Sequence, residues 1–367
     1  MFTAFSKAPS RPPRRRTPRA TPAFAVLCAI LPVLLVADAV TGSAPARGET
    51  AACWQPADLA RRPGEEQITK NVTDAFVPLP HGALSPRVAL PAHLRGALRR
   101  VDLPKGVRRI ALTFDLCEQP YEIAGYQGDI VDFLRDRGVA ATFFAGGKWL
   151  LTHQDRATQL MASPRFEVAN HAWEHRNFRL LDGARLGAEI DGTRLAYAHL
   201  HRSLARRQCA VPGRPGPAYQ TVAPDQALFR FPFGACNQQA LDAVNDRGVI
   251  AVQWDVSAGD PWRRLTAERM VAHVVSRTRP GSILIFHANG RGWQTGKALP
   301  LIVDALARKG YEFVTVGELL ATPGAQPVFT PTCYDAQPGD SDRYDDLARR
   351  LEVKYGEFYK RVGGRAP

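Results

Sequence analysis

The stretch RIALTFD, residues 109–115, is a short β-prone run that ends in a carboxylate, and it is the first of a series of such runs that decides the fold. Further runs of this kind follow at 141–145, 166–170, 228–232, 249–255, 281–287 and 312–316. Helix-like stretches separate them, at 127–137, 152–162, 183–204, 237–247, 265–278 and 296–309. Strand and helix therefore alternate about seven times, which predicts an α/β fold built on a parallel sheet or barrel.

Several of the predicted strands end in a polar residue of a catalytic type. These residues are Asp115, His171, Arg230, Asp255 and His287. In α/β barrels the carboxyl ends of the strands form the active face. Five such residues that converge on one rim are hard to explain as packing, so we expect a catalytic site there.

The regions outside the predicted barrel differ from it in composition. Residues 1–39 carry a basic segment, an apolar stretch and an Ala-Asp-Ala site, which predict a secretory signal peptide. Residues 40–105 indicate an irregular N-terminal extension, and the barrel itself is expected over 106–320. The remaining 321–367 indicate a Pro/Gly-rich linker and an amphipathic helix at 341–361, which either packs on the barrel or is solvated. Asn237 and Thr266 are expected to cap two barrel helices.

The charge and the signal pattern limit the partners. Removing residues 1–39 takes away six basic groups and Asp38, so the net charge falls from +13 to +8. A basic protein suits anionic cell-envelope polymers, but no clustered basic and aromatic motif indicates nucleic-acid binding. The apolar stretch is short for a bilayer and contains Pro32, so no membrane span is expected after cleavage. We expect a secreted, periplasmic protein.

The pair His171 and His175 is the first candidate metal site. Histidines at i and i+4 share one face of a helical turn, so both imidazoles can point at one divalent ion. A pair at this spacing is more often surface or core, so its meaning depends on what other segments supply.

Five ordered segments together resemble the NodB-type polysaccharide deacetylases, carbohydrate esterase family 4. They are TFDLCE at 113–118, NHAWEH at 170–175, RFPFG at 230–234, WDVSAGDPW at 254–262 and IFH at 285–287. The resemblance implies a distorted (β/α) barrel of about seven parallel strands. It also implies metal-assisted removal of N-acetyl or O-acetyl groups from a polysaccharide such as peptidoglycan or poly-N-acetylglucosamine. Two alternatives stay open: an inactive glycan-binding barrel and a hydrolase of small linear amides.

The resemblance assigns roles to residues of these motifs. Asp115 would be the general base, with Arg230 to orient it, and His287 would be the general acid. The partner of His287 would be Asp260, although Pro261 interrupts that motif and leaves Asp255 as an alternative. The backbone N–H of Phe233 would bind the oxyanion.

The metal would be held by His171 and His175, but the family's third ligand is missing. The family motif reads TFDD, and Leu116 stands where its second aspartate is expected. Three accounts remain: Glu118 reaches the ion, Asp115 is ligand and base together, or two histidines and waters hold it weakly. We expect a protein carboxylate to complete the site. Zinc is the expected ion, with cobalt or nickel as alternatives.

The cysteines and tryptophans add further expectations. A disulfide between Cys117 and Cys236 would join the first and third motifs, and a Cys53–Cys333 bond would tie the extensions together, leaving Cys209 free. Spacing alone does not fix connectivity. Trp262 and Trp293 are candidate walls for sugar rings, although core packing is the commoner role of tryptophan.

Overall fold

The fold is that of a computed structural model, which describes residues 53–70, 73–207, 209, 218–333 and 340–364. The chain divides into two units, Met1–Gly48 and Glu49–Pro367, and the description concerns the second. The predicted signal peptide lies outside the described residues.

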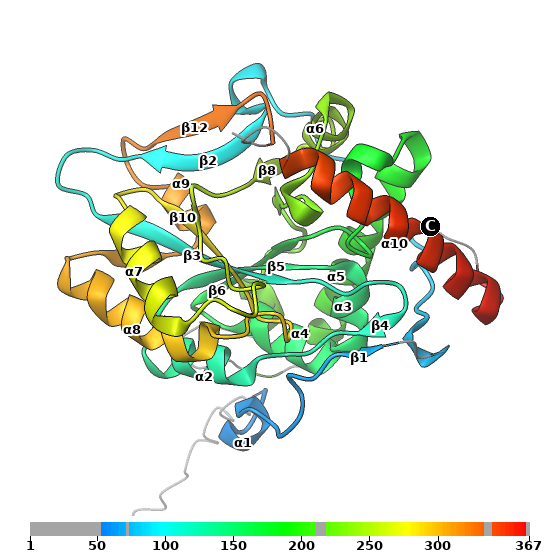
Figure 1. Cartoon of the computed structure of the whole chain (residues 1–367), viewed down its shortest axis with the longest axis horizontal. Helices are drawn as coiled ribbons and strands as arrows, with labels where there is room; N and C mark the ends of the chain where they lie inside the picture. The colour runs from blue at the N-terminus through cyan, green and yellow to red at the C-terminus, as the bar shows by residue number, and fades with distance from the viewer. Residues whose placement is uncertain (1–52, 71–72, 208, 210–217, 334–339, 365–367) are drawn as a thin grey trace, which may run out of the picture. The chain divides into compact units, whose positions relative to one another are not determined.

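A curved sheet of ten strands forms the centre of the protein (Figure 1). Its strand order is β12-β2-β8-β7-β6-β5-β3-β10-β9, and β11 pairs with β3 beside this path. The strands are β2 (Ala97–Asp102), β3 (Arg109–Leu116), β5 (Ala141–Ala145), β6 (Phe166–Asn170), β7 (Leu228–Phe229), β8 (Ile250–Val252), β9 (Val256–Ser257), β10 (Ile283–His287), β11 (Glu312–Val314) and β12 (Gln326–Thr330). All pair in parallel except β12 with β2. The order is open at both ends, so the barrel is incomplete.

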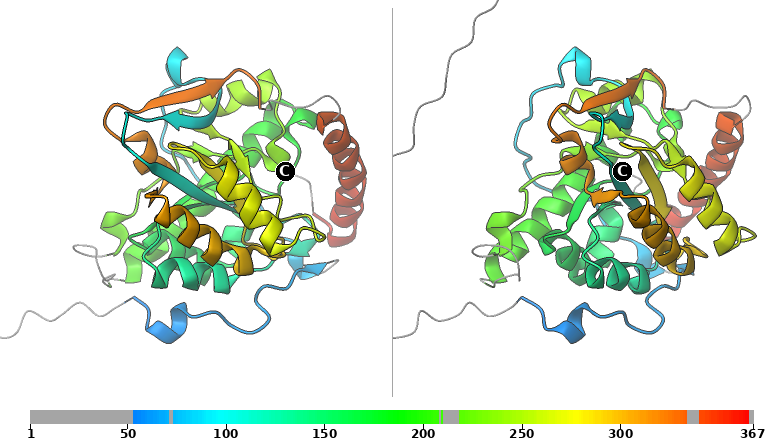
Figure 2. Two further views of the ribbon diagram at one scale, coloured as in Figure 1. Left: turned by 60° about the vertical axis from the view of Figure 1, so that its left-hand side comes forward. Right: turned by 90° about the vertical axis from the view of Figure 1, so that its left-hand side faces the viewer.

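Helices cover the outer face of this sheet (Figure 2). They are α2 (Gly128–Asp136), α3 (Gly147–Thr152), α4 (Gln154–Ala162), α5 (Gly183–Arg207), α6 (Gln238–Asn245), α7 (Ala267–Arg277), α8 (Thr295–Arg308) and α9 (Val316–Leu320). The predicted caps are confirmed, since the Asn237 and Thr266 side chains accept hydrogen bonds from the Ala240 and Arg269 amides. The α/β architecture with seven parallel strands from the predicted runs is therefore confirmed.

Alternation along β3 separates the core from the site. Leu112, Phe114 and Leu116 belong to the hydrophobic core under the helices. Thr113 and Asp115 point to the opposite, concave face, because successive strand residues face opposite sides. In the parallel register Asp115 is the partner of His287 on β10. Two side chains of catalytic type thus lie on neighbouring strands at the same height.

The sheet extends beyond 106–320 at both ends. β2 lies within the expected N-terminal extension, and β12 lies within the expected linker. These two strands pair over Asp102–Ala97 and Gln326–Thr330, and β2 continues the sheet through β8. The strands β1 (Thr69–Lys70) and β4 (Glu122–Ile123) form a separate two-stranded antiparallel sheet, and the short α1 (Pro56–Leu59) also lies outside the main sheet.

The helix α10 (Asp340–Val362) confirms the predicted C-terminal helix and packs on the domain. It buries Leu351, Tyr355, Phe358 and Tyr359 against a cluster that includes Tyr121 and Ala75. Among the described residues no helix has the length and apolar character that a bilayer crossing requires.

Candidate active site

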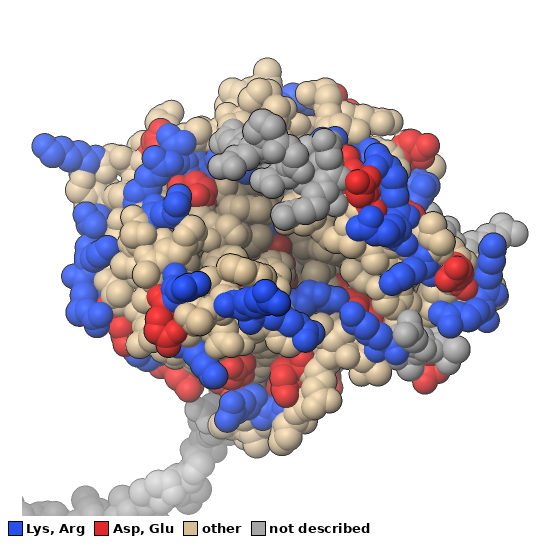
Figure 3. Space-filling view, viewed as in Figure 1, with Lys and Arg blue, Asp and Glu red and all other residues tan. Residues whose placement is uncertain are grey.

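A cavity of about 860 Å³ opens where the strands of the sheet end. Side chains from all five motifs line it, and α10 supplies part of one wall; the motif residues include Asp115, Cys117, His175, Phe233, Trp254, Trp262 and His287. In Figure 3 the face that carries the strand ends is hollowed near its middle. The predicted convergence of polar strand ends on one rim therefore exists.

Asp115 is held in place by Arg230. Arg230 Nη1 donates to Asp115 Oδ1 at 2.8 Å and to Thr113 Oγ1 at 2.8 Å. The guanidinium is fully buried and lies 3.9 Å from the centre of the Phe144 ring. Its remaining donors bind the carbonyls of Val252 and Gln253. Arg230 is therefore rigid, and it orients one oxygen of Asp115 while the other, Oδ2, lies 3.4 Å from His171 Nε2.

Asp115 remains ionised despite its burial. Burial alone would raise its pKa, but the neighbouring His171, Arg230 and His287 outweigh that effect, and the pKa is lowered. A carboxylate that stays charged in a cavity can accept a proton from a nearby water, which is the property required of a base.

His287 is paired with Asp260 and not with Asp255. Asp260 accepts hydrogen bonds from His287 Nδ1 at 3.0 Å, from the His287 amide at 2.7 Å and from Thr295 Oγ1 at 2.7 Å. Burial by itself lowers the pKa of His287, but the Asp260 carboxylate outweighs it and raises the pKa. Asp255 instead binds Ser282 and the Ile283 amide at the beginning of β10. The alternative partner is therefore at the wrong end of the strand.

The two histidines lie on a loop after β6, and the expectation that they share a helical turn is wrong. Ala172 and His175 have left-handed backbones, with φ of 63° and 59°. The Asn170 side chain stabilises this turn, since it accepts from the Ala172 amide and donates to the Ile190 carbonyl. The loop brings the His171 and His175 ring centres to 5.1 Å.

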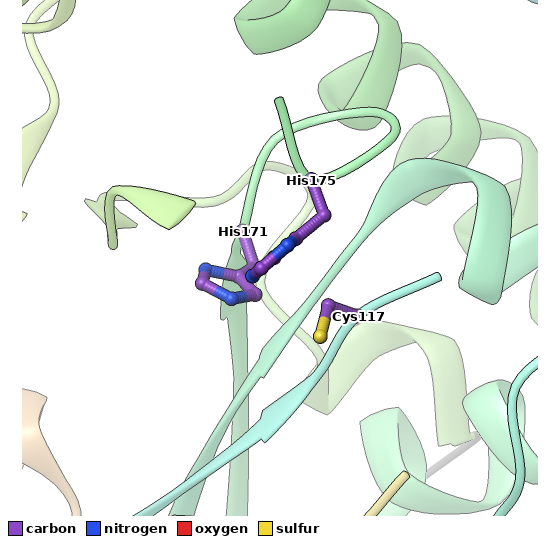
Figure 4. A group of neighbouring side chains, drawn as sticks. All are labelled: Cys117, His171 and His175. Atoms are coloured by element: carbon purple, nitrogen blue, oxygen red, sulfur yellow. The ribbon is translucent and has the colours of Figure 1, made fainter. Parts of the chain in front are cut away.

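Cys117 faces the two histidines (Figure 4). Ligand atoms of Cys117, His171 and His175 lie within 4.8 Å of one another. His171 Nδ1 is 3.0 Å from the Arg230 carbonyl, which fixes Nδ1 as the protonated nitrogen and leaves Nε2 with a lone pair. His171 Nε2 and His175 Nδ1 are buried without a hydrogen-bond partner among the described residues. Burial lowers the pKa of both imidazoles, so both are neutral, as metal ligands must be.

These observations fit a divalent metal ion. Buried nitrogens without partners are costly unless something binds them, and one thiolate with two neutral imidazoles is a ligand set typical of zinc. Burial raises the pKa of the Cys117 thiol to about 12, so binding an ion would release its proton.

The position of Glu118 does not support its predicted role as a ligand. Its carboxylate lies 3.1 Å from Lys148 Nζ and accepts from the Ala124 amide and the Thr152 hydroxyl. Both Glu118 and Lys148 are fully buried, so this pair is a structural one. The alternation of side chains along β3 could have indicated Cys117 as a site residue. Residue 117 falls on the same face as Asp115, whereas Leu116 and Glu118 fall on the opposite face.

The predicted disulfides are wrong in their pairing. The bonds are Cys53–Cys209 and Cys236–Cys333, and Cys117 is a free buried thiol. Cys333 follows β12, which pairs with β2, and it bonds Cys236 just after the third motif; the spacing of the cysteines in the sequence did not reveal this pairing. Cys117 instead accepts a hydrogen bond from Asn289 Nδ2 at 3.0 Å.

Both tryptophans predicted as walls for sugar rings are exposed, but only Trp262 lines the cavity. Trp262 is 58% exposed and lines the cavity, and Trp293 is 41% exposed and stacks with the Arg263 guanidinium at 4.0 Å. Phe233 also lines the cavity, with a left-handed φ of 58° and its ring centre 4.5 Å from that of His175. By contrast, Trp149 and Trp173 are fully buried core residues.

A buried charge network, which no pattern in the sequence predicted, joins the histidine loop to α10. Tyr359 donates to the Glu174 carboxylate, which lies directly before His175 in the chain. Arg176 contacts Glu174 at 3.3 Å, Glu189 at 3.4 Å and Glu352 of α10 at 2.7 Å. Asp345 of α10 extends the clamp, because it accepts hydrogen bonds from the neighbouring Asn177 and Arg179.

Comparisons with known proteins agree with this architecture. Residues 102–215 match the family model described as polysaccharide deacetylase. The chain is 28% identical over 227 residues to a chitooligosaccharide deacetylase of Bradyrhizobium sp., covering 58% of this chain and 91% of that protein. It is 27% identical over 223 residues to a peptidoglycan-N-acetylglucosamine deacetylase of Bacillus cereus, covering 60% and 91%.

A solved structure shows the same fold. A crystal structure of a peptidoglycan N-acetylglucosamine deacetylase matches with a TM-score of 0.50 at 22% identity, covering 61% of this chain and 92% of that chain. These matches agree with the five motifs on one rim. Residues 102–215 thus match the polysaccharide deacetylase family, the NodB-type domain of carbohydrate esterase family 4, and the relatives that the chain resembles are deacetylases of chitooligosaccharides and of peptidoglycan N-acetylglucosamine.

Proposed function

We propose that this protein is an exported, metal-dependent hydrolase that removes N-acetyl groups from a cell-envelope polysaccharide. The observation that carries the proposal is the placement of the Asp115–Arg230 pair, the His287–Asp260 pair and the Cys117, His171 and His175 cluster around one cavity. The names of the relatives from Bradyrhizobium and Bacillus cereus support chitooligosaccharides or peptidoglycan as the substrate class.

In this proposal Cys117, His171 and His175 hold the metal, for which zinc fits best. When bound, a divalent ion contributes Lewis acidity, which polarises the acetyl carbonyl and makes water more acidic. The thiolate takes the place of a carboxylate, so the absence of an aspartate at position 116 does not by itself imply an inactive protein. A thiolate also favours zinc over hard ions such as magnesium.

Asp115 and His287 divide the proton transfers between them. Asp115, ionised and held by Arg230, takes the proton of the attacking water. His287 is oriented by Asp260 and has a raised pKa, so it is suited to return a proton to the departing amine nitrogen. The backbone N–H of Phe233 stabilises the developing oxyanion, and Trp262 and Trp293 flank the sugar.

Export to an oxidising compartment is supported by two observations. The structure contains two disulfides, which persist in secreted and periplasmic proteins and are rare in the cytosol. The N-terminal 39 residues have the pattern of a cleaved signal. We therefore propose a periplasmic protein whose substrate is a glycan of the envelope.

Acetate release tests the proposal. The zinc-loaded protein is incubated with chitin oligomers, purified peptidoglycan and a small linear amide, and free acetate or ammonia is measured. Acetate from either glycan supports the proposal. Zinc binding without acetate release indicates an inactive glycan-binding barrel. Turnover of the small amide alone indicates a hydrolase of small linear amides.

A further inference from the structure

A second cavity adjoins the catalytic one. It has a volume of about 750 Å³ and lies between β1 and the C-terminal half of α10. Its lining residues are Lys70, Tyr121, Lys354, Glu357, Lys360 and Arg361. Lys70 and Tyr121 also line the catalytic cavity, so the two spaces share a wall. A glycan chain that leaves the catalytic cavity on this side would enter the second one.

The second cavity is cationic. Lys70, Lys354, Lys360 and Arg361 face it with Glu357 as the single carboxylate. Within the described ranges, none of these four cationic side chains makes an ion pair or a hydrogen bond, whereas Arg176, Arg179 and Arg185 nearby are all paired with acids. Figure 3 shows Lys and Arg side chains around the central hollow on this face. Unpaired cations along a groove favour an anionic ligand.

Arg291 continues this cationic lining into the catalytic cavity. Its Nη2 donates to both carboxylate oxygens of Glu122, at 2.7 and 2.9 Å, which fixes the guanidinium. Its Nη1 is buried and has no hydrogen-bond partner among the described residues. A buried donor without a partner is costly, so it indicates an acceptor supplied by a ligand.

We propose that the natural substrate is an acidic N-acetylated glycan, which carries carboxylates on sugars next to the one that is deacetylated. This inference rests on the proposed deacetylase function and specifies its substrate class. Arg291 Nη1 binds a carboxylate close to the reacting sugar, and the groove of Lys70, Lys354, Lys360 and Arg361 binds those further along the chain. A neutral glycan gains no binding free energy from the charge of these four cations. An acidic glycan forms a charge pair with each of them, and although one exposed pair contributes modestly to binding, the contributions add along the chain.

Three oligomers of equal length test the proposal. One is a neutral N-acetylglucosamine oligomer. The other two carry a carboxylate on every second sugar, one as a lactyl ether and one as a uronic acid. The test variant is Lys354→Gln/Lys360→Gln/Arg361→Gln. The matched control removes three exposed arginines of α7 and α8 outside both cavities, Arg269→Gln/Arg277→Gln/Arg308→Gln.

We expect the wild type to prefer the acidic oligomer through a lower KM. The test variant should raise that KM about tenfold at low salt, with kcat and the neutral oligomer unaffected, because three surface charge pairs are removed. The control variant should retain the preference. The two acidic arms decide whether the carboxylate on the ether or on the ring is the one bound.

Failure of this inference differs from failure of the deacetylase proposal. Equal KM values for neutral and acidic oligomers, with acetate released from both, overturn the acidic substrate and leave the activity standing. If neither oligomer is deacetylated, calorimetric binding decides: tighter binding of the acidic oligomer, lost in the test variant only, supports the groove. Equal binding of both oligomers overturns it.

Discussion

Removing Arg176 should destabilise the protein and weaken the packing of the loop that carries His171 and His175. Arg176 is 2% exposed and contacts the carboxylates of Glu174, Glu189 and Glu352. Glu174 and Glu189 are themselves almost fully buried, at 2% and 1%. Arg176→Met keeps most of the side-chain volume but leaves two buried carboxylates without their cation. Breaking a buried pair by removing one partner costs about 3–5 kcal/mol.

The loss should depend on pH in a defined direction. Burial raises the pKa of Glu189 to about 7, so its contribution to stability is greatest at low pH and is lost as pH rises through that value. Without Arg176 the pKa of Glu189 rises further, and the protonated form relieves the unpaired charge at low pH. One bound proton is worth about 1.4 kcal/mol per pH unit, and wild-type Glu189 loses its proton halfway through the window, so the loss should be at most about 1.4 kcal/mol smaller at pH 6 than at pH 8.

Urea unfolding of the metal-free, disulfide-intact protein at pH 6 and pH 8 measures this effect. Arg176→Lys should fall between the wild type and Arg176→Met, because it keeps the charge but not the forked geometry. Arg349→Met is the matched control: its ion pair with Asp346 is exposed, and it should change stability by less than about 1 kcal/mol. Zinc affinity of Arg176→Met should also fall, since Glu174 directly precedes His175. An Arg176→Met protein as stable as the control at both pH values would show that Arg176 does not stabilise the buried carboxylates.

Three further predictions concern the catalytic cavity. Cys117→Ala should weaken zinc binding at least about 100-fold, which is more than the loss of an outer-shell partner costs, whereas Glu118→Gln should leave zinc affinity unchanged. Competition with a chelator measures both affinities. Equal zinc affinity of Cys117→Ala and the wild type would exclude the thiolate as a ligand. Asp260→Asn should lower the pKa of His287, because the carboxylate that raises it is removed. The fall of kcat at high pH should therefore move to lower pH, and kcat should drop about 100-fold. An unchanged pH profile of kcat would argue against His287 as the general acid. Trp262→Ala should raise KM for an oligosaccharide several-fold with little change in kcat, because stacking contributes about 1 kcal/mol; an unchanged KM would remove Trp262 from the substrate wall.

Local patterns predicted the elements of the sheet well. The runs ending at Asp115, Asn170 and His287 are strands because their β-prone residues alternate between a helix-covered face and the concave face. The Asn237 and Thr266 caps were predictable because a cap needs only a few neighbouring residues. The strands β2 and β12 were missed, because each is stabilised by the other across more than two hundred residues of sequence.

The site was only partly predictable for the same physical reason. Asp115, Arg230 and His287 follow strands, and the parallel register places them together. The left-handed turn at Ala172 and His175 depends on Asn170 hydrogen bonds that no helical or strand period indicates. A carboxylate was expected as the third ligand and Cys117 was not predicted as a candidate, although strand alternation places residue 117 on the face of Asp115. The clamp of α10 on Glu174 and Arg176 depends on tertiary packing.

The most direct test of the account is a zinc titration in which acetate release and bound zinc are measured on the same metal-stripped sample. Without metal we expect no acetate from an N-acetylglucosamine oligomer or peptidoglycan, and with added zinc we expect a rate that rises linearly to a plateau at one zinc per chain. His171→Ala should show neither zinc uptake nor acetate. One bound zinc per wild-type chain with no acetate released from either glycan would contradict the account.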